Sequence, residues 1–573
     1  MAESAECRVQ KKFFTKDEAL QAILATDTED DSGSETSEHE SSGEFSPDYQ
    51  PNADDNIEED SSDWEEEEGA SDDAAEVVGQ DQDPSGSADQ TVWSSKNKKV
   101  MWHPTNEVAG HYVPARIPTP GPTLYAIARI SSPETAFALF VDEEIVAKIV
   151  EMTNLQGLRT INNWSPVTPQ ELRAYIGLLI LAGMYRSRHE ATSSLWGVNT
   201  GRPMFTNAMA HRRFMEVNRM LRFDDKLLRP QRHHANKLSP ISDLWSRWNF
   251  RLQKMFNAGR DVCVDEQLIA FRGRCSFKQY MPSKPAKYGI KIWALCDART
   301  SYALMLEVYT GKPPGGTREP NVGMRVVLGL TDALEGHTIT VDNFFTSIPL
   351  AAELKKKRNS LVGTVRRNKP ELPAQVTQIT GRQPLSSIFC FTKDMALVSY
   401  VPKKGKNVLV LSTAHKEPKV EDGGKRKPQM ILDYNKSKGA VDHLDQACGT
   451  YSTRRRAQRW PMCLFYHMLD ISAFNAFLLY TSVNPGWNAN KLYRRRLFLE
   501  EVGNALIMPE VHRRKPQTAA GAVQAAVQQQ EATPSPKRKQ CGLCTDKLIA
   551  SNACEKCGTP ICRKHMRSIC KNC

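Results

Sequence analysis

Acidic side chains are concentrated near the start of this 573-residue chain, and that concentration limits what can fold there. Residues 27–83 contain 24 Asp or Glu and no Lys or Arg. A segment this charged and this poor in apolar side chains cannot bury enough surface to offset the entropy that ordering costs. We therefore expect residues from about 27 to 95 to be disordered and the folded body to follow them.

The rest of the chain is strongly basic. It carries 76 Lys or Arg against the remaining 42 Asp or Glu, a net charge of +34, although the whole chain has only +10. Such a body attracts polyanions, and nucleic acid is the first candidate. A basic protein kept soluble by its acidic tail is the alternative. The chain is too long for one hydrophobic core, so several domains are expected.

The apolar stretches indicate buried helices and no membrane span. The first residues lack the apolar core of a signal peptide. Residues 172–184 are too few to cross a bilayer, and residues 460–480 include Pro461, His467 and Asp470.

Seven of the 14 cysteines fall in the last 33 residues, which favours metal ligation in a reducing compartment over a disulfide framework. A soluble protein is expected.

Patterns of apolar and turn residues divide the body into segments. Residues 118–259 are helical in pattern, and Thr168 to Glu171 combines a capping box with Pro at the first helical position. From residue 262, short β-branched runs alternate with turns and predict a mixed α/β domain. The predicted strands include 288–296, 301–308 and 338–341, and a strand-rich interruption at 370–428 adds 396–401 and 408–412. A helical pattern returns from 441 to about 506, and residues 517–536 form a linker.

Acidic residues stand where strands are predicted to end or helices to begin. Asp265 follows the run 262–264, and Asp342 follows the run 338–341. Asp442 and Asp445 are three residues apart, which puts both on one face of a helix. Carboxylates that converge from neighbouring strands can hold two Mg²⁺ or Mn²⁺ ions for phosphodiester chemistry. Each aspartate taken alone is more often a turn residue or a helix cap.

Three blocks around these aspartates resemble the piggyBac transposase family. The first is Asp265-Glu-Gln-Leu with the blocks 271–275 and 282–291, the second is 341–347, and the third is 434–445 with 459–461. The resemblance runs from about residue 137 to 460 and resumes in the terminal Cys/His module. It implies that Asp265, Asp342 and Asp442 are the catalytic metal ligands and that Asp445 is a fourth acidic position.

The resemblance also implies an architecture and an activity. The fold would be multidomain α+β, with an RNase H-like core of the retroviral integrase type, a strand-rich insertion, a helical DNA-binding unit and a terminal cross-brace zinc module. The activity would be cut-and-paste transposition at TTAA sites by a homodimer, with hairpin intermediates and excision without a footprint. Composition, residue patterns and the resemblance together predict these segments: 1–113 (disordered and acidic), 114–260 and 452–515 (helical dimerisation and DNA-binding unit), 261–369 and 429–451 (catalytic core), 370–428 (insertion), 516–540 (linker) and 541–573 (zinc module).

Basic residues cluster near the candidate carboxylates and are candidates for phosphate contacts. A solvated charged face is the ordinary alternative. Trp460 could stack on an unpaired base or pack at the start of a helix. The resemblance adds Arg366 and Lys369 in a strip near target DNA, although Pro370 replaces a basic residue of close relatives. The DNA-contact candidates are Arg272, Arg274, Lys284, Lys287, Lys291, Asn343, Ser347, Arg366, Lys369, Arg454, Arg455, Arg456, Arg459 and Trp460.

The last 33 residues carry four pairs of metal-binding side chains. The eight ligands are Cys541, Cys544, Cys554, Cys557, Cys562, His565, Cys570 and Cys573. This number suits two tetrahedral Zn²⁺ ions. Cross-brace and sequential pairing are both possible from spacing, and the resemblance supports the cross-brace and a role in binding transposon ends. RING and PHD modules, whose His comes fourth or fifth among the ligands, are a weaker match because here it comes sixth.

Three functions are compatible with this sequence. The first is an active transposase, and Pro536-Lys-Arg-Lys539 fits import into the nucleus. The second is a domesticated descendant that binds DNA or chromatin without transposing. The third is a zinc-dependent interaction protein with a decayed catalytic domain. The four intact aspartates favour the enzyme, because a pure binding protein has no chemical need for all of them.

Overall fold

The computed structural model describes residues 92–110, 115–229, 236–282, 284–311 and 319–514, together with 542, 552–553 and 559–561. The acidic region at 27–83, the linker and the eight predicted zinc ligands lie outside the described residues. The described strands are β1 (Trp93–Ser94), β2 (Met101–Trp102), β3 (Gly121–Pro122), β4 (Phe256–Asn257), β5 (Asp261–Ala270), β6 (Gln279–Tyr280), β7 (Tyr288–Asp297), β8 (Ala303–Val308), β9 (Thr338–Val341), β10 (Ser360–Thr364), β11 (Ser387–Phe391), β12 (Ala396–Tyr400), β13 (Val408–Ser412), β14 (Asn552–Ala553) and β15 (Pro560–Ile561).

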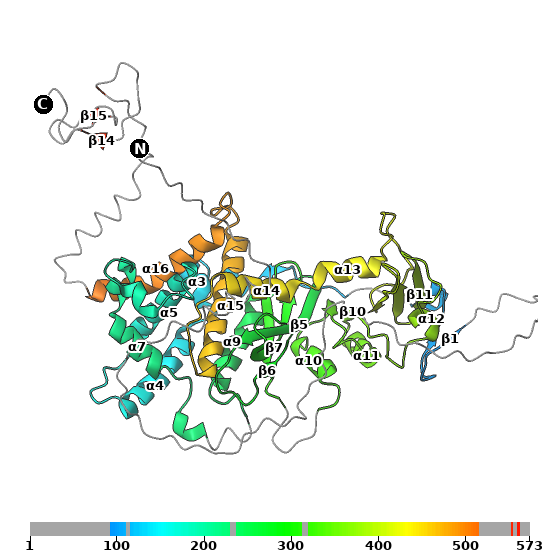
Figure 1. Ribbon diagram of the computed structural model, residues 1–573, viewed down its shortest axis with the longest axis horizontal. Coiled ribbons are helices and arrows are strands. Elements are labelled where there is room, and N and C mark those ends of the chain that lie inside the picture. The colour runs from blue at the N-terminus through cyan, green and yellow to red at the C-terminus, as the bar shows by residue number, and fades with distance from the viewer. Residues whose placement is uncertain are drawn as a thin grey trace, which may run out of the picture. The chain divides into compact units, whose positions relative to one another are not determined.

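The described α-helices fall mostly on either side of the strand-rich part of the chain. They are α2 (Leu124–Ile127), α3 (Pro133–Ala138), α4 (Glu143–Thr160), α5 (Pro169–Met184), α6 (Pro203–Ala208), α7 (His211–Met220), α9 (Ser242–Met255), α10 (Val322–Leu330), α11 (Ile348–Lys356), α12 (Ala374–Thr377), α13 (Gln429–Ser437), α14 (Ala440–Thr450), α15 (Trp460–Val483) and α16 (Arg494–Arg514). Figure 1 shows them along the chain. The mixed α/β class predicted from the sequence is confirmed.

A nine-stranded mixed sheet forms the centre of the described fold (Figure 1). Its order is β11-β12-β13-β10-β9-β5-β7-β6, with β8 paired to β7. The pairs β5–β9 and β9–β10 are parallel, and the other pairs are antiparallel. The parallel strands β9 and β10 are joined through α11, as a parallel crossover requires. The apolar runs of β5, β7 and β9 are buried, which explains their near-continuous hydrophobicity.

Helices from the two ends of the body pack together. Gly177 of α5 and Gly503 of α16 lie at their crossing, where an added Cβ would meet Ile507 at 2.8 Å and Leu181 at 2.5 Å. These glycines let the two helices approach closely although they are far apart in sequence. α15 also packs against α3. This packing agrees with one helical unit built from both flanking segments.

The start of α5 departs in one detail from the sequence prediction. Thr168 caps the helix by accepting a hydrogen bond from the Glu171 backbone amide at 3.1 Å, and Pro169 occupies the first helical position. The carboxylate of Glu171 does not complete the capping box. It binds the Arg213 guanidinium instead, at 2.7 Å, because a charge-assisted pair competes with the helix end for the same oxygens.

Among the described residues, α15 is the one helix that is long and apolar enough to cross a membrane, judged by length and composition alone. Its most apolar window is 89% buried inside the protein. It also contains buried polar residues, such as Asp470, which accepts hydrogen bonds from the Ser452 hydroxyl at 2.7 Å and the Thr453 amide at 2.7 Å. The apolar composition of α15 is therefore that of a core helix, as the sequence predicted.

The strand-rich segment 370–428 extends the central sheet. β13 pairs antiparallel with β10, and β12 and β11 follow it outward. One face of these strands packs with α13 into a separate apolar cluster that includes Phe391, Val398 and Tyr434. The segment thus has a core of its own while sharing the backbone hydrogen bonds of the sheet.

Residues 92–110 correct the predicted extent of the disordered region, which was placed at 1–113. β1 and β2 pair with each other, and His103 bridges to Phe391. Trp102 is fully buried, and its indole nitrogen donates to the Glu371 carbonyl at 3.0 Å. The acidic pattern gave no sign of this packing, because the partner residues are more than 260 positions away.

Candidate active site

Asp265 and Asp342 lie next to each other because β5 and β9 run parallel and in register. The last paired residues of the two strands are Val264 and Val341. The residue that follows each of them is one of the two aspartates. Neighbouring strands are about 4.8 Å apart, so both carboxylates start from adjacent backbone positions.

The strand-end prediction holds for Asp342 and is wrong for Asp265. β9 ends at Val341, and the Asp342 side chain accepts a hydrogen bond from the Phe344 amide at 3.0 Å, which fixes the turn that follows. Asp265 lies in the middle of β5, because pairing with β7 continues as far as Ala270. The two aspartates therefore meet where β9 ends beside the middle of β5, and not at the end of β5.

α13 and α14 bring the third acidic segment to the same place. The Thr340 and Ser437 hydroxyls are 2.6 Å apart, and the Cys263 thiol donates to the Lys438 carbonyl at 3.3 Å. These contacts fix the junction between the two helices against β9 and β5. α14 then packs over β5 and β7, with Asp442 in its first turn.

The surroundings of Asp265 disfavour its charged form. Burial, followed by the charge of Asp342, raises the pKa of Asp265 from 3.8 to about 7, and the charge of Asp442 acts in the same direction. A hydrogen bond from the Glu266 amide, at 2.7 Å, and the charge of Lys284 oppose the rise. Asp342 and Asp442 thus both act electrostatically on Asp265, as in a site that binds a cation.

The carboxylates do not form a complete metal cage in this arrangement. Within the described ranges, no group of three His, Cys, Asp or Glu side chains lies close enough together to hold an ion. Asp265 and Asp342 are adjacent, whereas Asp442 and Asp445 lie on α14, where both keep a solvent-accessible side although protein atoms surround the Asp445 carboxyl group. The donor set is nonetheless chemically suited to hard divalent cations, because it consists of carboxylate oxygens.

Asp445 is held by a chain of hydrogen bonds that the sequence did not indicate. The Gln267 amide donates to Asp445 at 3.2 Å, and its oxygen lies 3.3 Å from Nε2 of the buried His467. Burial raises the pKa of Asp445 to about 6, the charge of Lys284 lowers it, and that of Asp442 raises it. Gln267 is two residues from Asp265, so both side chains lie on the same face of β5. This two-residue spacing is the feature of the sequence that could have indicated Gln267 as a neighbour of the site.

Two of the predicted phosphate-binding lysines have a carboxylate partner beside the site. Lys291 lies 2.5 Å from Glu266, and Lys284 lies 3.9 Å from the same side chain. Lys291 also lies over the Phe344 ring at 5.2 Å. Both ammonium groups are mostly buried. Their positive charge is therefore only partly screened by solvent and acts on the neighbouring carboxylates.

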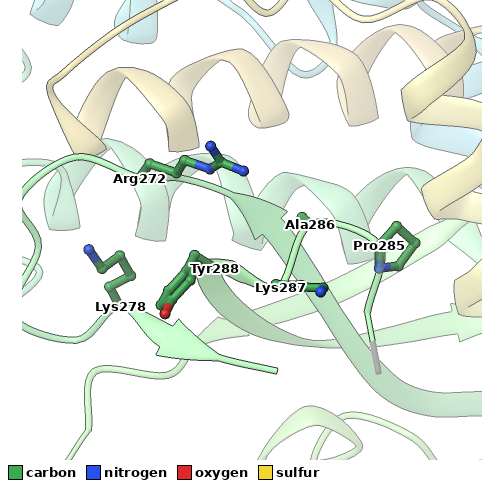
Figure 2. Close-up of a pocket in the computed structure, with 6 residues that line it drawn as sticks. All are labelled: Arg272, Lys278, Pro285, Ala286, Lys287 and Tyr288. Carbon is green, nitrogen blue, oxygen red and sulfur yellow. The ribbon is translucent and has the colours of Figure 1, made fainter. Parts of the chain in front are cut away.

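Other predicted cations point toward solvent. Arg272, Arg274, Lys287 and Arg456 are exposed. Arg272, Lys278, Lys287 and Tyr288 line a hollow of about 600 Å³ beside the loop that follows β5 (Figure 2). These positions remain compatible with phosphate contacts.

The strip after β9 and β10 has mixed roles. Arg366 donates to the Asn343 side chain at 3.3 Å, so these two candidates bind each other. Ser347 caps α11 by accepting a hydrogen bond from the Leu350 amide at 3.2 Å. Lys369 is partly exposed. The Ser347 hydroxyl therefore has a structural function that accounts for its place.

Two arginines before α15 need a correction. Arg455 is buried and donates to the Ser187 carbonyl at 2.7 Å. Arg459 donates to the carbonyls of Leu221 and Asn218, each at 2.6 Å. Their guanidinium groups join the segment after α5 and the end of α7 to the start of α15, and a phosphate cannot reach the buried donor of Arg455.

Arg454 and Trp460 also contribute to packing. Arg454 donates to the Ala270 carbonyl at the end of β5. Trp460 meets Phe277 edge-on, with ring centroids 5.0 Å apart. Of the two interpretations of Trp460, this geometry favours packing at the helix start over base stacking.

The comparisons with known proteins identify the class. A family model for transposase IS4 matches residues 132–477, which is more than half of the chain and includes β5, β9 and α14. The chain belongs to this transposase family, in its piggyBac type. It is 25% identical over 418 residues to human PiggyBac transposable element-derived protein 3, covering 68% of each chain. It is 24% identical over 371 residues to human PiggyBac transposable element-derived protein 2, covering 61% of each.

A solved structure agrees with this assignment. The fold is similar to that of a piggyBac transposase in a synaptic complex with hairpin DNA, with a TM-score of 0.67 and 30% identity. The match covers 80% of this chain and 100% of the other. The resemblance stated from the sequence motifs is thus confirmed at the level of family and overall fold.

Proposed function

We propose that this protein is an active DNA transposase of the piggyBac type that cuts and rejoins DNA at an aspartate site. The observation that carries the proposal is the placement of Asp265 and Asp342 directly after the last paired residues of two adjacent parallel strands, with Asp442 of α14 acting electrostatically on Asp265. A raised pKa at Asp265 fits a site that is completed by a cation, because a nearby positive charge reverses the penalty on the anionic form.

The site residues have distinct roles in this proposal. Asp265, Asp342 and Asp442 would hold Mg²⁺ or Mn²⁺, which supplies activation of the attacking oxygen and stabilisation of the leaving oxygen. Asp445 is a fourth acidic position, oriented by Gln267. Lys284 and Lys291, paired with Glu266, limit the negative charge beside the scissile phosphate.

Exposed cations would grip the DNA backbone on either side of the cut. The candidates that the structure leaves at the surface are Arg272, Arg274, Lys287, Lys369 and Arg456. Contacts of this kind position the duplex without reading its sequence. End recognition is assigned to the terminal module with two Zn²⁺ ions, whose ligands lie outside the described residues.

The finer parts of the proposal follow the family. They are an RNase H-like catalytic core, a homodimer, target joining at TTAA, hairpin intermediates, excision without a footprint and a nuclear location. The structural relative is a complex with hairpin DNA, and this supports hairpin chemistry as the first pathway to test.

A domesticated DNA-binding protein without transposition is the second candidate. The names of both human relatives describe them as derived from a transposable element. The absence of a three-residue metal group among the described residues is compatible with this alternative too. The four retained aspartates favour the enzyme.

Cleavage of labelled ends decides between the two. Full-length protein is incubated with candidate transposon ends flanked by TTAA, with Mg²⁺ or Mn²⁺, beside a gel-shift assay. Asp342→Asn should abolish cleavage and keep DNA binding. Asp332→Asn, an exposed aspartate paired with Lys357 away from the site, is the matched control and should cut normally. Normal cleavage by Asp342→Asn would disprove the aspartate assignment, and binding without cleavage by the unaltered protein would favour the domesticated function.

A further inference from the structure

We propose that Tyr288 is the floor of a binding site for an unpaired nucleotide, in which the base stacks on the ring and neighbouring cations hold the phosphate. The inference rests on the proposed function for its DNA substrate, and its test is independent of end sequence. The site is the hollow in Figure 2, where Tyr288 is flanked in that view by Lys278 and Lys287, with Arg272 on another side.

The first observation is the exposure of two aromatic rings in a strand. Tyr288 is 44% exposed and Tyr280 is 52% exposed. They are paired across β6 and β7, with ring centroids 4.7 Å apart. Exposed aromatic rings that support each other in this way are suited to stacking with a planar ligand.

The second observation is the charge of the hollow. Its lining has three cations, Arg272, Lys278 and Lys287, and no acidic side chain. No carboxylate within the described ranges pairs with any of the three. Lys278 makes a long contact with the Gly273 carbonyl, at 3.4 Å, and its ammonium lies over the Tyr288 ring, 5.8 Å from the ring centroid. Three cations without counter-charges around an exposed ring are suited to a ligand that combines a flat face with a phosphate.

The third observation is the backbone of Lys287. Its φ of 51° lies in the left-handed region, which costs a side-chain-bearing residue about 1 kcal/mol or more. The conformation is held by hydrogen bonds from the Met281 amide to the Lys287 carbonyl at 2.7 Å and from the Lys287 amide to the Lys284 carbonyl at 3.0 Å. A lysine at a position that glycine would occupy more easily points to a use for its charge.

The position of the ring relative to the carboxylates indicates which part of the DNA reaches it. Asp265 pairs with Ala294 in β7, and Tyr288 is six residues from Ala294, so Tyr288 faces the same side of the sheet as Asp265. Six residues of strand correspond to about 20 Å. At the duplex rise of about 3.4 Å per nucleotide this span corresponds to roughly six nucleotides from the scissile phosphate, and to fewer where the strand is unpaired and extended.

The ligand must be unpaired. A base inside a duplex has both faces covered by its neighbours, so the Tyr288 ring can reach only a base that has left the stack or belongs to a single strand. Cutting and rejoining create such strands next to the site. Stacking does not depend on base identity, so the site should accept any short single strand.

The test uses the full-length protein in EDTA and a 12-nucleotide single strand that contains the fluorescent base 2-aminopurine. Binding should quench the fluorescence. Tyr288→Ala should lose about five- to a hundredfold in affinity and lose the quenching. Tyr288→Phe keeps the ring and should retain both. Tyr493→Ala removes another half-exposed tyrosine and should behave as the unaltered protein.

The charge is tested by Lys287→Gly, which suits the left-handed backbone and so removes the cation without harming the fold. The slope of log affinity against log salt should fall by about 0.7 for a single strand. Equal affinity and quenching of Tyr288→Ala and the unaltered protein would overturn the site, as would failure of the unaltered protein to bind the single strand. If transposon ends are still cleaved in either of these outcomes, the nucleotide site is wrong but the proposed transposase function stands. Failure of the site and failure of the proposed function can therefore be told apart.

Discussion

The side-chain amide of Gln267 donates a hydrogen bond to Asp445 at 3.2 Å and joins α14 to β5 at the carboxylate cluster. Its oxygen faces Nε2 of His467, whose pKa burial lowers to about 4, so the imidazole is neutral and can donate. The Gln267 side chain thus donates to Asp445 through its nitrogen and accepts from His467 through its oxygen. This arrangement makes Gln267 a positioning residue for Asp445.

Replacement of Gln267 by Leu should slow cleavage by about 10- to 100-fold, the usual effect of losing a residue that orients a metal-site carboxylate. The loss should be accompanied by a need for more Mg²⁺ or Mn²⁺, because Asp445 is no longer held. DNA affinity should not change. The measurement is the cleavage rate as a function of metal concentration, with thermal unfolding as a check on the fold. An unchanged metal dependence would rule out the positioning role.

Stability should depend on pH through Asp265. Its folded pKa is raised to about 7 from 3.8, so the folded state binds a proton more tightly than the unfolded state. The resulting stabilisation is complete below about pH 4 and is lost as pH rises through 7. Asp265→Asn should therefore raise the free energy of unfolding at pH 8 by on the order of 1–3 kcal/mol in EDTA.

Denaturation with urea between pH 5 and 8 measures this effect. The difference between Asp265→Asn and the unaltered protein should be small at pH 5 and grow with pH. Divalent metal should stabilise the unaltered protein more than the variant. Two curves that stay parallel over the whole range would show that Asp265 carries no penalty in the folded protein.

Trp102 should hold residues 92–110 against the strand-rich segment. Trp102→Ala removes a fully buried ring and its hydrogen bond to Glu371, a change that costs about 3–5 kcal/mol locally. Hydrogen exchange should rise in residues 92–110 and around Phe391, and remain unchanged around β5. Met101→Ala, at a half-exposed position on the same strand, is the control and should have little effect. Equal exchange in the two variants would contradict this docking.

The terminal Cys/His segment, which we predict to bind zinc, should serve recognition and not chemistry. Changing Cys554 and Cys557 to Ser should release zinc and weaken selective binding of transposon ends, because so small a segment folds only with its metal. Non-selective nicking by the aspartate site should persist. Zinc content, end binding and unfolding of the main body are measured together. A zinc-depleted variant that still selects its own ends would assign the module another role.

Local sequence patterns determined the elements of this protein. The β-branched runs predicted β9 and β13 at their observed bounds, and Thr168 with Pro169 marked the start of α5. The motifs around Asp265, Asp342 and Asp442 determined the family. These features depend on residues close together in the chain, such as helix caps, alternation of apolar and polar residues and short sequence motifs, and their signal is present before folding.

Only the tertiary structure decided which residues share a site. Asp265 lies in mid-strand because the pairing of β5 with β7 continues beyond the end of β9. Arg455 is buried where it contacts Ser187, a residue 268 positions away in sequence. The pairing of Gln267 with Asp445 and the docking of Trp102 are of the same kind. Such contacts depend on long-range strand register and helix packing, which local periodicity does not encode, because many registers satisfy the same alternation of side chains.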